Sequence, residues 1–327
     1  MNPQQPAIAP PADGDRTLIQ GPFHVVLNSG SGHRDSDETG AAISSVLSAA
    51  GRRFELLEVS VGAQLPVVAR EAVARARRDG GVVVAAGGDG TLNTVCQALA
   101  GSGVPLGVVP LGTFNYFARN HGIPQDAKAA ACCLLDARIQ PVHAGFLNGH
   151  IFLVNASLGL YPRLLEEREA YKGRLGRSRL VALFSALATL GRAHRVLGVQ
   201  VEVEGRSRYL RTVSMVVASN ALQLEHIGVE LADQLQQGQL AAMLVRPIGN
   251  LALYGLLLRG LLRSLGSAEN LHSFPFTTMS VSRAHQRSIK VALDGEVCRM
   301  RLPLEFRAGP GALSLLVPRN PVLRERA

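Results

Sequence analysis

The stretch AAGGDGTLNTV, residues 85–95, completes the apolar run GVVVAA and contains three glycines around a single acid, Asp89. Apolar residues then recur at the spacing of one helix face, at Leu92, Val95, Cys96 and Leu99. A buried strand that ends in a glycine-rich turn and leads into a helix is the repeating unit of α/β folds. The stretch therefore predicts a doubly wound parallel sheet.

The same alternation runs through the first part of the chain. Buried strands are predicted over 23–27, 54–61, 81–86 and 105–110, with helices over 38–50, 64–79, 91–100 and between 114 and 136. We therefore predict an α/β nucleotide-binding domain over residues 21–140. The proline-rich residues 1–20 are predicted to form a disordered tail, and residues 319–327 a second tail.

The rhythm changes after residue 140. Runs of alternating and β-branched residues separated by turn signals predict antiparallel strands, interrupted by helical insertions near 162–192 and 249–265. Residues 141–318 are therefore predicted to form a β-rich second domain. Its last segment is the one that could return to the first domain.

The net charge and the residue composition limit the kinds of molecule that the protein could bind. The net charge of +9 favours an anionic partner, such as nucleotide phosphates, nucleic acid or an acidic membrane surface. No nucleic-acid-binding signature accompanies the charge, and no apolar run is long enough to span a membrane. The four cysteines lack metal-ligand spacing, which favours reduced thiols in a cytoplasmic protein.

Three loops follow a predicted strand and precede a helix: LNSGSG (27–32), AGGDGTLN (86–93) and PLGTFN (110–115). Such loops share the carboxyl edge of the sheet, where glycines and helix N-termini can hold phosphate. Each loop alone is also compatible with a simple turn, and Thr91 with a helix cap. Together they predict a nucleotide crevice, although neither a Walker sequence nor G-x-G-x-x-G is present.

Two acidic positions need an explanation. Asp89 would repel phosphate unless Mg²⁺ or an ordered set of donors stood between them; alternatively it binds the backbone of its own turn. In LDGEV (293–297), Asp-Gly is a strong hairpin signal. Asp294 and Glu296, two apart on an extended chain, could also point the same way, one accepting a proton and the other steadying metal or nucleotide.

Several segments together resemble the diacylglycerol kinase catalytic-domain family of lipid kinases, which includes ceramide and sphingosine kinases. The resemblance runs from about Phe23 to Pro318. It rests on NSGSG, GGDGTLN, PLGTFNYFARN, LGLYPRL, VVASNAL, LQQGQL, LDGEV and LEFRAGPGALSLLVP. GGDGT is shared with NAD kinases, whereas PLGTFN separates the two, and LGLYP resembles a bacterial subgroup.

The resemblance implies an α/β domain of the NAD kinase and diacylglycerol kinase type, a C-terminal β-sandwich domain, and ATP in the cleft between them. It implies transfer of the γ-phosphoryl group of MgATP to a lipid hydroxyl, of diacylglycerol or a similar lipid. Asp294 matches the catalytic base and Glu296 its companion. The implied ATP contacts are Asn28, Ser29, Gly30, Ser31, Gly32, Ser60, Gly87, Gly88, Asp89, Gly90, Thr91, Leu92, Asn93 and Thr113.

This chain departs from the family pattern at three places. Tyr116 and Tyr161 stand where members often have an acid, and Gln236-Gln237-Gly238 stands where bacterial diacylglycerol kinases have an acidic turn that helps bind a structural magnesium. The network of acids that ties the two domains in those enzymes is therefore expected to be altered here. We assign no metal ligands from the sequence.

A lipid acceptor also implies transient contact with the inner face of the membrane. Leucines and arginines mix in 166–195 and in LYGLLLRGLLRSLG (253–266), which predicts weak peripheral binding, with ordinary packing on the second domain as the alternative. Other functions stay open: a soluble-substrate kinase of the NAD kinase type, or a nucleotide- or lipid-binding regulator that has lost catalysis. Nucleic-acid binding is not expected, and the oligomeric state, a dimer included, stays open.

Overall fold

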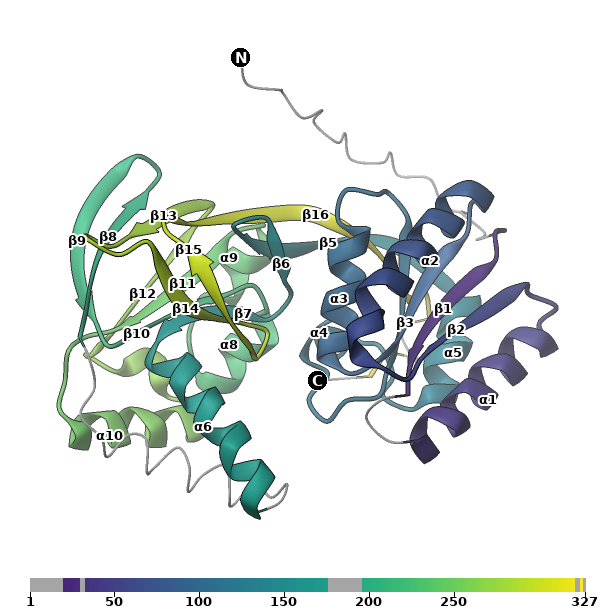
Figure 1. Cartoon of the computed structure of the whole chain (residues 1–327), viewed down its shortest axis with the longest axis horizontal. Helices are drawn as coiled ribbons and strands as arrows, with labels where there is room; N and C mark the ends of the chain where they lie inside the picture. The colour runs from purple at the N-terminus through teal and green to yellow at the C-terminus, as the bar shows by residue number, and fades with distance from the viewer. Residues whose placement is uncertain (1–19, 30–32, 176–195, 321–323, 326–327) are drawn as a thin grey trace.

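The computed structural model describes residues 20–29, 33–175, 196–320 and 324–325. It shows two domains side by side, an N-terminal one around a parallel sheet and a C-terminal one of antiparallel strands (Figure 1). The predicted fold class is confirmed. The predicted N-terminal tail, apart from Gln20, and most of the second half of the first helical insertion lie outside the described residues.

The N-terminal sheet has the parallel order β2-β1-β3-β4. Its strands are β1 (Phe23–Asn28), β2 (Phe54–Val59), β3 (Val82–Gly87) and β4 (Pro105–Pro110). The helices are α1 (His33–Ala49), α2 (Leu65–Asp79), α3 (Asp89–Leu99), α4 (Tyr116–Asn120) and α5 (Ala127–Leu135), with the short 3-10 turn η1 (Gly62–Gln64). Every residue of β3 is buried, as expected for a parallel strand covered on both faces. Accordingly α1 packs with α5, and α2 with α3.

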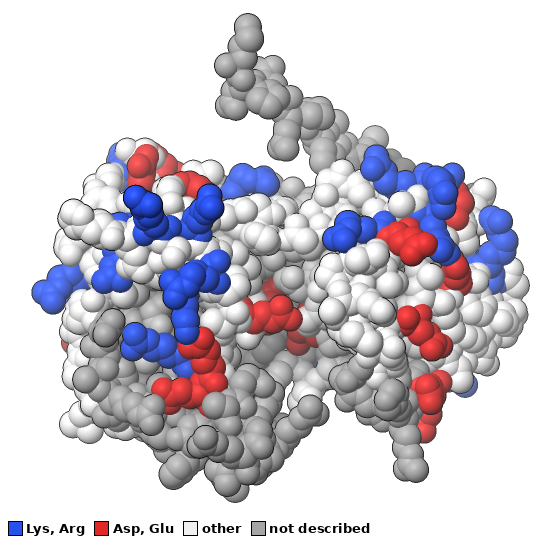
Figure 2. Space-filling model, viewed as in Figure 1, with Lys and Arg blue, Asp and Glu red and all other residues white. Residues whose placement is uncertain are grey.

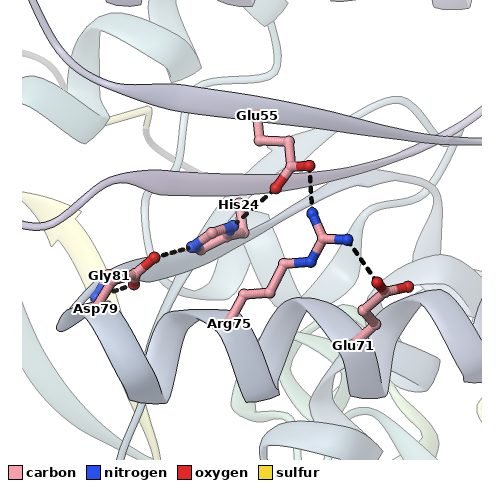
Figure 3. Close-up of polar contacts among 6 residues, drawn as sticks. All are labelled: His24, Glu55, Glu71, Arg75, Asp79 and Gly81. Atoms are coloured by element: carbon pink, nitrogen blue, oxygen red, sulfur yellow. Dashed lines mark hydrogen bonds and ion pairs between the residues drawn. The ribbon is translucent and has the colours of Figure 1, made fainter.

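A cluster of charged side chains holds the amino edge of this sheet (Figure 3). The buried His24 lies between Asp79 (Nε2 to Oδ2, 3.0 Å) and Glu55 (Nδ1 to Oε2, 3.4 Å). Arg75 bonds to both Glu55 and Glu71, and its hydrogen bond is the main cause that lowers the pKa of Glu55. The cluster ties β1, β2 and α2 together at the edge opposite the glycine-rich loops, so its role is structural.

The C-terminal domain is a sandwich of two sheets. One contains β12 (Leu271–Phe276), β11 (Leu240–Val245), β10 (Ser214–Ala218), β7 (Asn155–Gly159), β14 (Ser288–Leu293) and β15 (Glu296–Arg301) in that order. The other contains β5 (Ala137–Leu147), β6 (His150–Phe152), β8 (Leu197–Val203), β9 (Arg206–Thr212), β13 (Thr278–Ser282) and β16 (Leu304–Pro318). Inward side chains such as Leu158, Met215, Val281 and Phe306 form the core between them.

Helices α6 (Leu160–Leu175), α8 (Ala221–Ile227) and α9 (Ala232–Gln236) contact strands of the six-stranded sheet, and α10 (Asn250–Leu261) contacts α8 and the turn η2 (Leu265–Ser267). The sequence predicted the regions of α6 and α10 but not α8, α9 or β12. The two short helices lack a full apolar repeat, and β12 carries a proline and a histidine that weaken its strand signal.

The long strand β16 joins the domains. Its first part pairs with β13, while Ser314 and Leu315 pair in parallel with Pro105 and Leu106 of β4. A single ten-stranded sheet therefore runs through both domains, along the top of the view in Figure 1. Because β16 and β5 pair along nearly their whole length, the connection is a broad ribbon rather than a thin linker.

Candidate active site

The glycine-rich loops meet at the carboxyl edge of the N-terminal sheet. At the end of β1, the Asn28 amide donates to the Thr91 hydroxyl at 2.8 Å, which joins the first loop to the second. Ser29 bonds to the Val59 carbonyl of β2 through both its backbone N–H and its hydroxyl. The predicted contacts Gly30, Ser31 and Gly32 lie outside the described residues.

The second and third loops touch through their glycines. A Cβ on Gly112 would lie 3.0 Å from the Cα of Gly88 and 2.6 Å from Oδ1 of Asn115. A hydrogen bond from the Leu111 N–H to the Gly87 carbonyl adds to this contact. Glycine at 112 is therefore required by close backbone approach.

Asn115 is a site residue that the sequence analysis missed. It has a left-handed backbone (φ 47°) and a buried side chain that accepts from the Gly112 N–H and donates to the Gly112 carbonyl and to Gln125. Its place in PLGTFN was visible, but nothing in the sequence showed that its amide shapes the loop around Gly112. Asparagine is the residue that tolerates this backbone while bonding locally.

Asp89 opens α3 and points at the third loop. Its Oδ2 accepts the Asn115 N–H at 3.1 Å; burial raises the pKa of Asp89, and the N–H groups of Asn115 and Tyr116 oppose that rise. An ordered set of donors, one of the explanations that the sequence left open, is therefore present around Asp89. Those donors belong to the neighbouring loop, not to the turn of Asp89 itself.

The N-terminus of α3 has the features of an anion-binding site. The first backbone hydrogen bond of the helix runs from the Leu92 N–H to the Gly88 carbonyl, so among the described residues the N–H groups of Asp89, Gly90 and Thr91 have no acceptor. Unpaired N–H groups and the positive end of the helix dipole favour phosphate. Thr91 is buried beneath this turn and adds rigidity to it.

Asp294 and Gly295 form a two-residue turn, with φ of 45° and 93°, between β14 and β15. The hairpin interpretation is therefore confirmed, and the turn also carries the candidate base into the space between the domains. Figure 2 shows acidic side chains facing the hollow between the two domains. Glu296 reaches furthest, since its Oε1 lies 3.1 Å from the position of a Cβ on Gly90.

The Asp294 carboxylate accepts four hydrogen bonds. Oδ1 accepts from the N–H groups of Val154 and Asn155, both at 2.9 Å, and Oδ2 from the Leu153 N–H and the Asn93 amide, both at 2.7 Å. Burial raises the pKa of Asp294, while these donors favour the ionised form and oppose the rise. Asp294 is thus an anchor for the β6–β7 loop as well as a candidate base.

Helix α3 provides the contact across the cleft. Asn93 donates to the Ile151 carbonyl as well as to Asp294, and Gln97, one turn later, accepts from the Ile151 N–H at 2.8 Å. Gln97 was not predicted, because a lone glutamine on the polar face of a helix carries no signal. A contact between Asn93 and ATP stays a prediction.

A cleft of about 520 Å³ opens beside these residues. Its polar lining includes Asn93, Gln97, Glu296, Arg70 and Arg299. Its apolar lining includes Pro66, Ala98, Ile151, Leu293, Val297 and Met300. The cleft is amphiphilic and reaches Glu296 of the candidate acid pair. Ser60 and Thr113 lie exposed in the β2–η1 and β4–α4 loops.

Tyr116, one of the positions that depart from the family pattern, lies in an uncharged contact between the domains. Asn220, the cap of α8, donates to the Tyr116 carbonyl at 3.2 Å, and the Leu222 N–H donates to Asn120 at 3.1 Å. The Tyr116 ring meets His226 edge to face at 6.1 Å. Among the described residues, no group of three or more histidine, cysteine or acidic side chains could hold a metal. These residues do not fit a structural metal site.

Comparison with known proteins agrees with this architecture. Residues 22–147 match the family model described as Diacylglycerol kinase catalytic domain. The chain is 40% identical over 92 residues to Diacylglycerol kinase of Bacillus subtilis, covering 27% of this chain and 30% of that protein. It is 51% identical over 79 residues to "Probable lipid kinase YegS-like" of Pseudomonas aeruginosa (strain UCBPP-PA14), covering 24% of this chain and 26% of that protein.

The crystal structure of a diacylglycerol kinase from Bacillus anthracis str. Sterne superimposes with a TM-score of 0.70, covering 94% of this chain and 100% of that chain at 20% identity. At this identity the likeness concerns the fold. No helix within the described ranges is both long and apolar enough to cross a membrane.

Fold and site thus define a two-domain protein with an α/β domain and a β-sandwich domain that meet at a cleft. Residues 22–147 are similar to the diacylglycerol kinase catalytic domain, in agreement with the resemblance found in the sequence. The aligned stretches span about a quarter to a third of the two curated relatives, 26% and 30% of their lengths.

Proposed function

We propose that this protein is an ATP- and Mg²⁺-dependent lipid kinase that transfers the γ-phosphoryl group to a lipid hydroxyl, of diacylglycerol or a similar lipid. One observation carries the proposal: the Asp294–Glu296 turn of one domain stands over the N-terminus of α3 in the other, with Glu296 beside Gly90. Phosphoryl transfer needs this juxtaposition of a phosphate cradle and an acidic pair.

The phosphates of MgATP would lie against the free N–H groups of residues 89–91, with the magnesium brought by the nucleotide. Close backbone approach at Gly88 and Gly112 holds the second and third loops together beside these N–H groups. Preorganised backbone donors stabilise the charge that develops during transfer, which is the largest contribution a protein can make to this reaction.

The lipid hydroxyl would approach from the amphiphilic cleft. Of the four donors on Asp294, the Asn93 amide is the one side chain, so the incoming hydroxyl would take its place at Oδ2 and give up its proton there. Glu296, exposed at the mouth of the cleft, would steady the magnesium or the γ-phosphate. Peripheral contact with the inner face of the membrane would supply the acceptor.

The test is transfer of label from γ-labelled ATP, with Mg²⁺, to mixed micelles of extracted bacterial lipids. We expect one labelled lipid, strongly reduced by Glu296→Gln and unchanged by Glu230→Gln, an exposed glutamate on the same domain. Label in NAD instead of lipid would move the protein to the soluble-substrate class. Bound ATP with no transfer to any acceptor would favour a regulatory binding protein.

A further inference from the structure

Helix α10 contains both buried and exposed leucines among the residues whose burial is described. Leu253 and Leu256 are 4% and 9% exposed and join Leu160, Val213 and Ala268 in a small core. Three other leucines, 251, 258 and 262, are 86%, 57% and 67% exposed. Spacings of seven and four place those three on one face of α10 and of the turn that follows it, since Leu262 comes directly after the last helical residue; we call them the leucine stripe.

The stripe is unusual for this molecule. It supplies three of the seven large apolar residues that are exposed in the described part of the chain, and the other four are spread over separate elements. A helix that is apolar on all sides is normally enclosed, because leaving it in water costs free energy at every exposed leucine. The free face of α10 therefore calls for an apolar phase outside the folded chain.

The charges around the stripe indicate what that phase is. From residue 246 to 268 the sequence contains three arginines, Arg246, Arg259 and Arg263, and no acidic residue. In the described part of the chain none of them has an acidic partner; Arg259 bonds to the carbonyl and hydroxyl of Ser267. A leucine face with unpaired arginines beside it matches the hydrocarbon and the anionic headgroups of a bilayer.

A groove continues this surface. Arg246 and Pro247, just before α10, line an open groove of about 540 Å³ together with Leu210, Leu244, Arg211 and His272. Its lining is again apolar side chains with basic ones between them. In Figure 1, α10 lies at the outer edge of the C-terminal domain, away from the N-terminal domain.

We propose that the leucine stripe, with Arg246, Arg259 and Arg263, docks on a bilayer that contains anionic phospholipid. The proposal rests on the proposed function insofar as docking brings the acceptor lipid to the kinase. A second copy of the chain is the weaker occupant, because three leucines fall well short of the ~800 Å² per partner that a stable interface buries.

Flotation with vesicles tests the proposal. Vesicles of phosphatidylcholine with roughly one third phosphatidylglycerol supply both the apolar phase and the negative surface. We expect Leu258→Gln to lower the vesicle partition coefficient by roughly tenfold, and Leu258→Gln with Leu262→Gln by more. The matched control is Val67→Gln on α2, since Val67 is also 57% exposed, and it should bind like the unmodified protein.

Binding should weaken with pure phosphatidylcholine and with added salt, as the arginines require. The proposal would be overturned if the double leucine variant bound vesicles as well as the unmodified protein does. It would also be overturned if Leu258→Gln and the control Val67→Gln lost vesicle binding equally. So would a dimer in analytical ultracentrifugation that Leu258→Gln converts to a monomer. Because the exposed positions contribute little to folding, unchanged urea midpoints should accompany every variant.

Failure of the docking surface and failure of the kinase proposal are separable. Flotation requires no turnover, so vesicle binding without any transfer would leave docking standing and reject the kinase. Transfer to a short-chain diacylglycerol below its micelle concentration, with no flotation, would keep the kinase and reject docking. In the expected case, the double variant phosphorylates the short-chain acceptor normally and vesicle lipid poorly.

Discussion

Replacement of Asp294 by asparagine should destabilise the protein as well as inactivate it. Asparagine keeps one oxygen, which can still accept from Val154 and Asn155, but its amide group then faces the N–H of Leu153 and the amide of Asn93. Two hydrogen bonds to a charged acceptor are lost. At about 1.5–3 kcal/mol each, partly offset by relaxation, the free energy of unfolding should fall by about 2–4 kcal/mol.

Urea unfolding of Asp294→Asn against the unmodified protein measures this directly. Asp126→Asn is the matched control, since Asp126 caps α5 through the Ala129 N–H and asparagine caps a helix equally well. Its free energy of unfolding should change by less than about 0.5 kcal/mol. If Asp294→Asn were equally neutral, the carboxylate would not be anchoring residues 153–155, and the account of the turn as an anchor would be wrong.

Gly90→Ala should stabilise α3 by up to about 1 kcal/mol, measured by urea unfolding, because alanine favours a helix more than glycine does. It should also slow phosphoryl transfer at least tenfold, because the new methyl group meets Glu296. An unimpaired transfer rate would contradict the placement of Glu296. Burial lowers the pKa values of His121 and His143 from 6.5 to about 4, so below pH 6.5 the unfolded chain binds protons that the native chain does not. Stability should therefore fall from pH 7 to 5 by about 1–2 kcal/mol per histidine, and His143→Gln should reduce that fall; a pH-independent urea midpoint would refute it. Chelation with EDTA in the absence of nucleotide should leave the thermal midpoint unchanged, because neutral contacts around Tyr116 tie the domains; a drop of several degrees would reveal a structural metal.

These experiments separate two roles that one substitution at Asp294 would confuse. Loss of activity in Asp294→Asn follows from either a missing base or a displaced loop. Glu296 is exposed at the rim of the cleft, so Glu296→Gln should leave the urea midpoint unchanged and report on catalysis alone. Glu296→Gln therefore tests the acidic pair without displacing the loop that Asp294 anchors.

The sequence predicted the parts of the fold that depend on local patterning. The apolar repeat at Leu92, Val95, Cys96 and Leu99 is the buried face of α3, and the strands before each loop are where the apolar runs placed them. Short elements were missed where tertiary contact decides the structure. Helix α8, for example, is seven residues long and is capped by Asn220, whose amide bonds to the other domain.

The motifs of the site could be predicted from the sequence, but the hydrogen bonds that connect them could not. GGDGTLN and LDGEV mark residues that do meet across the cleft, through Asn93 and Asp294. The partners of Asp89 could not be predicted, because its hydrogen bond to the Asn115 N–H depends on the left-handed backbone of a loop 26 residues away. Gln97 shows the same limit, since its hydrogen bond to β6 joins two domains.

The central claim is that MgATP lies between the N-terminus of α3 and the Asp294–Glu296 turn. A crystal structure with Mg²⁺ and a non-hydrolysable ATP analogue tests it most directly. The account predicts phosphate oxygens within hydrogen-bond distance of the backbone N–H groups of residues 89–91, with the γ-phosphate facing Asp294 and Glu296 across the cleft. Phosphates bound elsewhere, or a γ-phosphate turned away from the acidic pair, would contradict it.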